Sequence, residues 1–274
     1  MTLKTLRLSS SGAKVALRSA GRGAPVVLVH GVGLQSAAWG PQIEALSAHH
    51  HVIALDMPGH GGSDPLPEGS GLEAFVAWAA EALAALGLGP VSLAGHSMGA
   101  LIAGGLAVEH PDLLRRVALL NPVFCRAPAD RAAVEARAAL IRAGEINHAA
   151  PLSRWFSLDP EERAVRSATK SWLEAVSPTG YATAYSAFAT GDATYAARMG
   201  EIRIPLLALT GSEDANSTPQ MARAIADTVQ NGRHETIKGH RHMVNLTAPD
   251  LVNHALAEWL ARPDAPAVIH EVAS

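Results

Sequence analysis

Short apolar runs alternate with longer stretches in which apolar residues recur at helical spacing. The runs occupy residues 25–29, 51–55, 91–94, 116–120 and 204–209. Each run is continuous and is followed within four residues by a glycine or a proline. Runs of this kind, apolar on both faces, are typical of parallel strands that helices cover on both sides. The pattern therefore predicts an α/β fold with a doubly covered sheet.

The stretches between the runs are predicted helices, and the chain begins with a predicted hairpin. The helical stretches are residues 72–86, 99–109 and 219–229. Thr218 is a suitable N-cap for the last of them, and Pro219 suits its first helical position. Residues 3–8 and 14–19 predict an antiparallel hairpin at one edge of the sheet. Together these signals predict about eight mostly parallel strands.

One interval, residues 123–199, carries helical patterns and no strand pattern; 130–142 and 161–176 are its clearest helices. We expect a helical cap at 122–202, inserted before the strand near 204–209, with a core formed by 1–121 and 203–274. Eight of the twelve aromatic residues (four Phe, five Trp, three Tyr) fall in this interval: Phe124, Trp155, Phe156, Trp172, Tyr181, Tyr185, Phe188 and Tyr195. About half of them should line a substrate pocket, for which we select Trp155, Phe156, Tyr181 and Tyr185.

The composition narrows the classes of partner. With 48% hydrophobic and 17% charged residues, the chain can form a sizeable core. A net charge of -3 gives no reason to expect nucleic acid or an anionic membrane surface as a partner. No apolar run approaches the roughly 20 residues of a membrane span, and residues 1–7 lack a signal-peptide pattern. The single Cys125 excludes an intrachain disulfide. We expect a soluble, cytoplasmic protein that acts on a small-molecule substrate, an apolar or small acyl compound.

The strongest local signal is Gly95-His96-Ser97-Met98-Gly99. It lies between a predicted strand and a predicted helix, which is the context of a nucleophile elbow. A serine on such a tight turn projects its hydroxyl above the sheet, and glycines two residues away on either side avoid steric collisions. Ser97 is the predicted nucleophile. We expect the side chain of His96 to point away from the serine oxygen.

A serine nucleophile needs a base, and the base needs a third group to orient it. In chain order the acid should follow the nucleophile and precede the base. Asp214 lies just beyond the apolar run 204–209, and we prefer it to its neighbour Glu213. His242 lies at the entrance of a C-terminal helix, and we prefer it to His240.

The anionic intermediate of acyl transfer needs amide donors. One should be the N–H of Met98, directly after the nucleophile. The other should come from the glycine-containing loop after residues 25–29, where we select Val32 and keep Gly33 as the alternative. The histidine spacing lacks a metal-binding pattern such as H-E-x-x-H. We therefore expect neither a metal nor a cofactor.

These segments resemble the α/β-hydrolase superfamily over most of the chain. The matching residues are 30–33, 56–64, 95–99, 211–214 and 242–249. Within the superfamily, Ser97 excludes members with an aspartate nucleophile, and the carbon–carbon bond hydrolases of ring-cleavage pathways usually have Asn where this chain has His96. Residues 153–156 and 180–181 are similar to 3-oxoadipate enol-lactonases. That resemblance implies a small ester or lactone substrate, whose carboxylate Arg154 would meet if Arg154 does not simply face solvent.

Three functions are therefore compared. The first is hydrolysis of a carboxylic ester or lactone through an acyl-enzyme. The second keeps the Ser97–His242–Asp214 triad but acts on an amide, thioester or carbon–carbon bond, or performs cofactor-free lyase chemistry. The third is a non-enzymatic small-molecule receptor, which the complete triad disfavours.

Overall fold

A computed structural model describes residues 2–263, so the predicted core residues 264–274 lie outside the described part. Within it, eight strands form one sheet in the order β1-β2-β4-β3-β5-β6-β7-β8. The strands are β1 (Thr2–Arg7), β2 (Lys14–Ala20), β3 (Ala24–Val29), β4 (His50–Leu55), β5 (Val91–His96), β6 (Leu114–Leu120), β7 (Leu206–Gly211) and β8 (Gly232–Ile237). β1 and β2 form the predicted hairpin, β2 pairs antiparallel with β4, and all other pairs are parallel. The predicted mostly parallel α/β sheet is confirmed.

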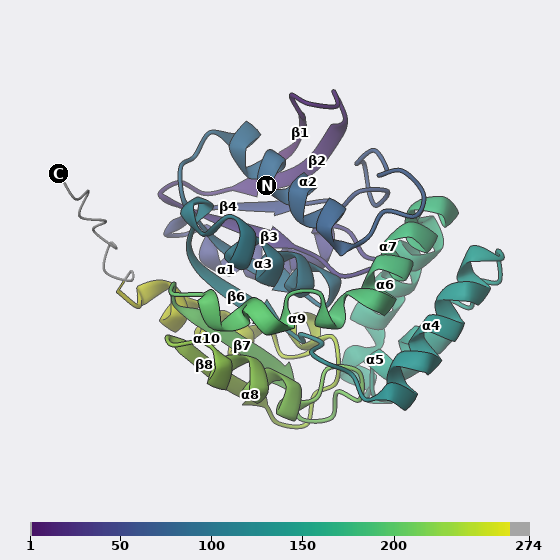
Figure 1. Cartoon of the computed structure of the whole chain (residues 1–274). Helices are drawn as coiled ribbons and strands as arrows, with labels where there is room; N and C mark the ends of the chain where they lie inside the picture. The colour runs from purple at the N-terminus through teal and green to yellow at the C-terminus, as the bar shows by residue number, and fades with distance from the viewer. Residues whose placement is uncertain (1, 264–274) are drawn as a thin grey trace.

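Helices cover both faces of the sheet (Figure 1). Successive strand residues point to opposite faces. On β3, Val27 and Val29 accordingly join one apolar cluster, whereas Val26 and Leu28 join the other. Buried residues of α2 (Leu72–Leu86), α3 (Met98–Glu109) and α8 (Pro219–Thr228) belong to the first cluster. Those of α1 (Gly40–Leu46) and α10 (Pro249–Ala261) belong to the second, and α9 (Val244–Thr247) contributes Val244 to the second and Leu246 to the first. Burial on both faces explains why the strands are continuously apolar.

Local signals set several helix ends. α2 has the bounds that the sequence predicts, and it ends at Gly87, whose φ of 64° lies in the left-handed region that glycine adopts without strain. α8 begins at Pro219, and the hydroxyl of Thr218 accepts a hydrogen bond from the N–H of Met221 at 3.3 Å. Thr218 is therefore the N-cap that the sequence predicts.

Between β6 and β7 the chain forms helices rather than strands. These are α4 (Pro128–Arg142), α5 (Ala149–Trp155), α6 (Arg163–Ala175) and α7 (Pro178–Thr190), joined by short turns of 3₁₀ helix. We name residues 128–201 the helical insertion. In Figure 1 its four α-helices gather at one end of the sheet. The segments that follow β3, β5, β6, β7 and β8, together with the helical insertion, supply the residues of the site described below.

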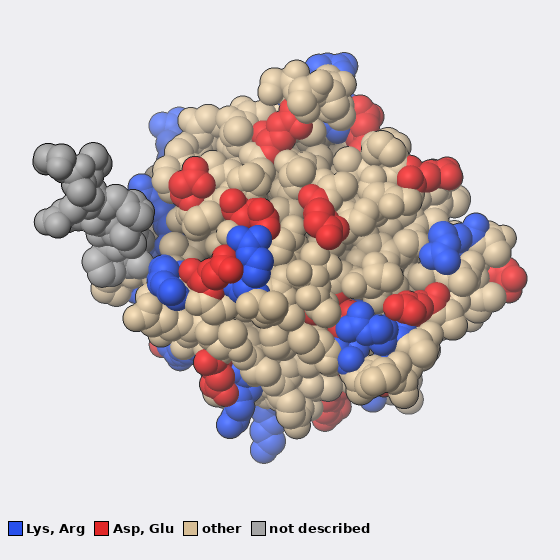
Figure 2. Space-filling view, in the orientation of Figure 1, with Lys and Arg blue, Asp and Glu red and all other residues tan. Residues whose placement is uncertain are grey.

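The face of the molecule shown in Figure 2 carries acidic and basic side chains interspersed, without a continuous area of one sign. Arg198, for example, forms ion pairs with Glu109 and Glu201. Among the helices of residues 2–263, none is both long enough and apolar enough to cross a membrane.

Candidate active site

Ser97 occupies the sharp turn between β5 and α3. Its φ of 55° and ψ of −112° are unusual for a residue other than glycine. A Cβ atom at Gly95 would lie 2.0 Å from the carbonyl oxygen of Gly99, and one at Gly99 would lie 2.1 Å from that of Val29. Both positions therefore require glycine, which explains the G-x-S-x-G pattern physically.

His242 and Asp214 form a buried pair. The Nδ1 atom of His242 lies 2.7 Å from Oδ2 of Asp214. Oδ1 of Asp214 accepts hydrogen bonds from the amides of Asn216 and Ser217 at 2.8 and 3.1 Å, and Oδ2 accepts one from Nδ2 of Asn121 at 2.8 Å. Burial alone would raise the pKa of Asp214, but His242 and these hydrogen bonds outweigh burial and lower it. The carboxyl group is therefore held as a carboxylate.

Asn121 is a site residue that the sequence analysis missed. It follows β6, has a φ of 48° and is fully buried. The sequence analysis did not assign it a role because an amide cannot replace the charge of the acid. In the structure the same amide donates to Asp214 and lies 3.2 Å from the Thr210 hydroxyl. In the sequence, the signal was the position of Asn121 directly after a predicted strand. In the structure that strand lies beside β7, and the backbone conformation of residue 121 is one that Asn tolerates.

The rival residues lie elsewhere. The Glu213 side chain is 54% exposed and faces Nε of Arg241 at 3.9 Å. Nδ1 of His240 lies 3.0 Å from the hydroxyl of Thr247. Neither residue lines the cavity that contains Ser97. Within residues 2–263, no group of three or more His, Cys, Asp or Glu side chains is placed to bind a metal ion.

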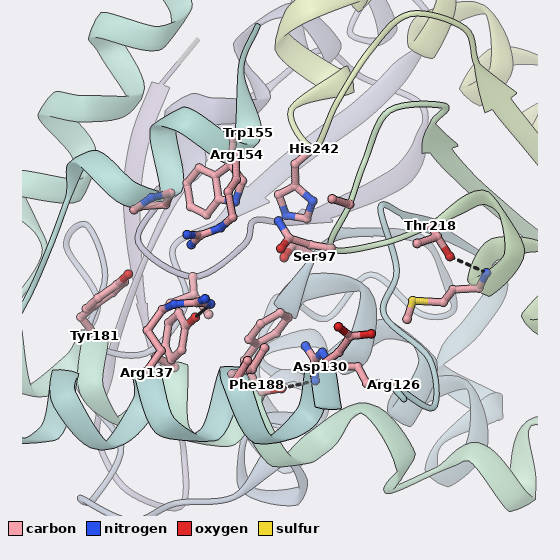
Figure 3. A pocket seen from close by; sticks show the side chains of 18 residues that line it. Ser97, Arg126, Asp130, Arg137, Arg154, Trp155, Tyr181, Phe188, Thr218 and His242 are labelled. Carbon is pink, nitrogen blue, oxygen red and sulfur yellow. Dashed lines mark hydrogen bonds between the residues drawn. The ribbon is translucent and has the colours of Figure 1, made fainter. Parts of the chain in front are cut away.

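Ser97 and His242 line the same cavity, with the imidazole directly beside the serine (Figure 3). Among the described residues, none forms a hydrogen bond with the Ser97 hydroxyl. Such bonds are often long before substrate binds. The His242 ring is stacked on Trp155, with ring centres 5.6 Å apart, and tilted against His96 at 5.0 Å. Nε2 of His96 donates to the His242 carbonyl at 2.9 Å, so the base is held from several sides.

The loop after β3 contains Val32 and Gly33, the two residues considered as the second oxyanion donor. The N–H of Gly33 donates to Nε2 of His60 at 2.9 Å. Burial, followed by the charge of His30, lowers the pKa of His60 to about 3, so this imidazole stays neutral and accepts the bond. Val32 lines the cavity, and its N–H has no acceptor among residues 2–263. The N–H of Met98 belongs to the first turn of α3, where amides lack intrahelical acceptors.

The cavity encloses about 170 Å³ between the sheet and the helical insertion. It is lined by Val32, Ser97, Arg126, Asp130, Ala133, Val134, Arg137, Pro151, Arg154, Trp155, Tyr181, Tyr185, Phe188, Ala215, Asn216, Thr218, Met221 and His242.

Four of the selected cap residues, Arg154, Trp155, Tyr181 and Tyr185, are among them. Phe156 is not, because its side chain is 1% exposed and is packed in the apolar core. Phe156 is therefore not placed to contact a ligand in this cavity.

Three arginines line the cavity, and they differ in their partners. Arg126 is paired with Asp192 at 3.2 Å. Arg137 donates to the Tyr185 hydroxyl at 3.0 Å, and within residues 2–263 neither Arg137 nor Arg154 forms an ion pair. Burial, together with the charge of Arg137, lowers the pKa of Arg154. Arg137 and Arg154 thus face the cavity without an ion-pair partner, although Asp130 lines another part of it (Figure 3). The sequence analysis identified only Arg154.

Residues 24–249 match the family described as the alpha/beta hydrolase fold. The chain belongs to this family. The resemblance predicted from the sequence is thereby confirmed for the superfamily. Because the family consists of many hydrolases on one scaffold, membership does not by itself select a substrate.

This α/β hydrolase is similar to several characterised proteins. It is 48% identical over 260 residues to the (E)-2-((N-methylformamido)methylene)succinate hydrolase of Acinetobacter baylyi, covering 95% of this chain and 98% of that protein. A thermophilic esterase from Thermogutta terrifontis, determined with malate bound, superimposes with a TM-score of 0.85 at 25% identity, covering 95% and 98% of the two chains. The enol-lactonase of Burkholderia xenovorans LB400 gives a TM-score of 0.84 at 24% identity, covering 95% and 100%. The last likeness shows the fold alone.

Proposed function

We propose that this α/β hydrolase cleaves the carbon–nitrogen bond of an acylated nitrogen in a small dicarboxylate, through an acyl-enzyme on Ser97. One observation carries the proposal: a single cavity is lined by Ser97 and by His242, which is paired with Asp214, and also by two arginines that form no ion pair within residues 2–263. The Acinetobacter relative is named for a substrate that combines a formamide group with a succinate. Both parts of that compound have a counterpart in this cavity.

The first half of the reaction forms the acyl-enzyme. The Ser97 oxygen attacks the acyl carbon while Nε2 of His242 takes the hydroxyl proton. Asp214 holds Nδ1–H of the imidazole and stabilises the imidazolium that forms. The amides of Val32 and Met98 hold the oxyanion, and each such donor contributes about 3 kcal/mol in other hydrolases. The carbon–nitrogen bond then breaks as His242 gives its proton to the leaving nitrogen, and this completes the acyl-enzyme.

The second half of the reaction restores the enzyme. Water then attacks the acyl carbon while His242 takes one of its protons, and the Ser97–acyl bond breaks as the serine oxygen regains a proton. The products are a carboxylic acid and an amine or enamine that carries the two carboxylates.

The arginines explain the choice of a charged substrate. A carboxylate accepts two parallel hydrogen bonds from one guanidinium group, and arginine is well suited to this geometry. An anion between Arg137 and Arg154 would also relieve their mutual repulsion, which helps to lower the pKa of Arg154. Tyr181 and Tyr185 border the same part of the cavity and can donate through their hydroxyl groups.

Hydrolysis of a carboxylic ester or lactone is the second candidate, and it is the reaction that the sequence analysis preferred. The same serine, base and oxyanion donors perform it. The Thermogutta neighbour is named an esterase, and malate, also a dicarboxylate, is bound in it. The two candidates differ in the bond that breaks and agree on an anionic substrate.

A substrate panel tests the proposal. We expect release of formate from (E)-2-((N-methylformamido)methylene)succinate, with a higher kcat/KM than for carboxylated esters or lactones. Ser97→Ala should lower kcat by about 10⁴-fold or more. Ser167→Ala, at an exposed position of α6, is the matched control and should change it less than about twofold. Equal rates for Ser97→Ala and wild type would exclude the acyl-enzyme, and faster ester cleavage would favour the second candidate.

A further inference from the structure

The residue before the proposed base, Arg241, joins the loop of His242 to the end of α5. Its NH1 group donates to the carbonyl oxygens of Phe156 at 2.8 Å and Ser153 at 3.2 Å. Carbonyls in the last turn of a helix have no intrahelical donors, and a cation is favourable at that end of the helix dipole. One guanidinium group therefore fixes the end of α5 against a loop that is 85 residues away in sequence.

The segment fixed in this way carries two residues of the cavity. Between the carbonyls bound by Arg241 lie Arg154, which lines the cavity, and Trp155, whose ring is stacked on His242. α5 has only seven residues, and a helix this short is not stable by itself. Its position must therefore come from tertiary contacts, and Arg241 supplies two of its hydrogen bonds.

Arg241 itself stays outside the cavity lining, and its side chain is 36% exposed. An oxygen of the exposed Glu213 side chain lies 3.9 Å from Nε of Arg241. Any influence of Arg241 on substrate therefore has to pass through residues 153–156.

We propose that Arg241 is a positioning residue for substrate selectivity: it fixes residues 153–156 so that Arg154 meets a carboxylate of the substrate. The proposal rests on the anionic substrate of the proposed function. His242 keeps its hydrogen bonds to Asp214 and from His96 without Arg241. Loss of Arg241 should therefore weaken anion binding and leave the turnover of a small neutral ester nearly unchanged.

Inhibition by succinate separates these effects. Hydrolysis of p-nitrophenyl acetate, a neutral ester, reports the catalytic residues, and the inhibition constant Ki of succinate reports the anion site. Arg154→Ala should raise Ki by about 10- to 100-fold, the range for hydrogen bonds between charged groups. Arg241→Ala should raise it about tenfold, because a displacement of about 1 Å is costly in a site of fixed geometry. Arg241→Lys, which can still donate to one carbonyl, should recover part of the loss.

The decisive variant is the double substitution Arg154→Ala/Arg241→Ala. If Arg241 acts through Arg154, the Ki of the double variant should equal that of Arg154→Ala within about twofold, since coupled residues are not additive. Arg142→Ala removes an exposed α4 arginine that hydrogen-bonds to Ser186 outside the cavity, and it should leave Ki unchanged. In Arg241→Ala, Arg241→Lys and Arg142→Ala, kcat/KM for p-nitrophenyl acetate should stay within about threefold of the wild-type value.

The outcomes distinguish the two proposals. If succinate fails to inhibit the wild type, or Arg154→Ala leaves Ki unchanged, the anionic substrate of the proposed function is wrong. If Arg154→Ala raises Ki while Arg241→Ala does not, only the role of Arg241 is overturned. A tenfold effect of Arg241→Ala that persists in the Arg154→Ala background would also overturn it. So would a parallel loss of p-nitrophenyl acetate hydrolysis, which would show a general structural role.

Discussion

The strand ends of the sheet and the helical insertion handle charge in opposite ways. At the strand ends, the carboxylate of Asp214 is enclosed by His242, by the Asn121 amide and by two backbone amides. In the insertion, Arg137 and Arg154 face the cavity, and within the described residues no carboxylate pairs with either. The carboxylate at the strand ends has its partners within the protein, whereas the two arginines would gain an ion-pair partner from a bound anion.

This difference separates two tasks. A reacting centre benefits from charges and dipoles that are already held in place, because no reorganisation is then needed during the reaction. A selective binding site benefits from groups whose partners are missing, because a ligand that supplies them is preferred over one that does not. We therefore assign the chemistry to the strand ends and the choice of substrate to the insertion.

The largest expected effect is the loss of kcat/KM when the negative charge at the strand ends is removed. Asp214→Asn should lower kcat/KM for both neutral and anionic substrates by about 10³- to 10⁴-fold, because an amide cannot stabilise the imidazolium. Glu213→Gln, one residue away and exposed, is the matched control and should change kcat/KM less than about threefold. Steady-state kinetics on p-nitrophenyl acetate measures kcat/KM of both variants. Similar losses for the two variants would remove the distinction between Asp214 and its neighbour.

The next test removes a cation from the insertion. Arg137→Ala should lower kcat/KM for a dicarboxylate substrate by about 10- to 100-fold, because it loses a charged hydrogen-bond donor. The rate for p-nitrophenyl acetate should stay within about threefold of wild type, whereas Asp214→Asn slows both substrates. Comparing the two substrates in one preparation gives the measurement. If Arg137→Ala slowed both substrates equally, the arginine would serve the structure rather than selectivity.

Acid should destabilise the strand-end region through its buried histidines. Burial lowers the pKa values of His60 and His96 to about 3, and burial also lowers that of His30. Between pH 6.5 and 3 the unfolded chain binds protons that the folded chain does not. The free energy of unfolding should therefore fall as pH decreases through this range, by about 1.4 kcal/mol per pH unit for each of His60 and His96, and His30 should add to the fall. The lowered pKa of Asp214 adds a further loss only below its ordinary range.

Urea denaturation at pH 7.5, 6.5 and 5.5 measures this slope. His60→Gln should reduce the pH dependence of the free energy of unfolding by the contribution of one histidine. His254→Gln, at a 74% exposed position on α10, is the matched control and should leave the slope unchanged. A pH-independent free energy of unfolding between pH 6.5 and 5.5 would contradict the neutral state of the buried histidines.

The smallest expected effect is a change in the free energy of unfolding, and its sign should differ between the two regions. Arg154→Met should raise the free energy of unfolding without ligand by a few tenths to about 1 kcal/mol, because it removes a cation repelled by Arg137. Asp214→Asn should lower the free energy of unfolding, because it removes a satisfied buried charge. Thermal unfolding with and without succinate measures both. Destabilisation of the ligand-free protein by Arg154→Met would show that the insertion does not carry uncompensated charge.

The sequence by itself determined the strands, the main helices and the order of the site residues. Continuous apolar runs signal buried parallel strands, and glycines at 95 and 99 signal the turn at Ser97, because each depends on residues adjacent in the chain. Asp214 was predicted from its position just after a strand, and His242 from its position at the entrance of a C-terminal helix. The structure brings these residues to one edge of the sheet because the carboxyl ends of parallel strands lie together.

Only the tertiary structure decided which of residues 154–156 line the cavity. Arg154 and Trp155 line it, whereas Phe156 is turned into the core. Asn121 likewise reaches Asp214, 93 residues later in sequence. The direction of a side chain from a short helix depends on how the helix is rotated against its neighbours. That rotation is set by contacts between segments far apart in the chain, such as Arg241 with residues 153–156, and local pattern does not encode it.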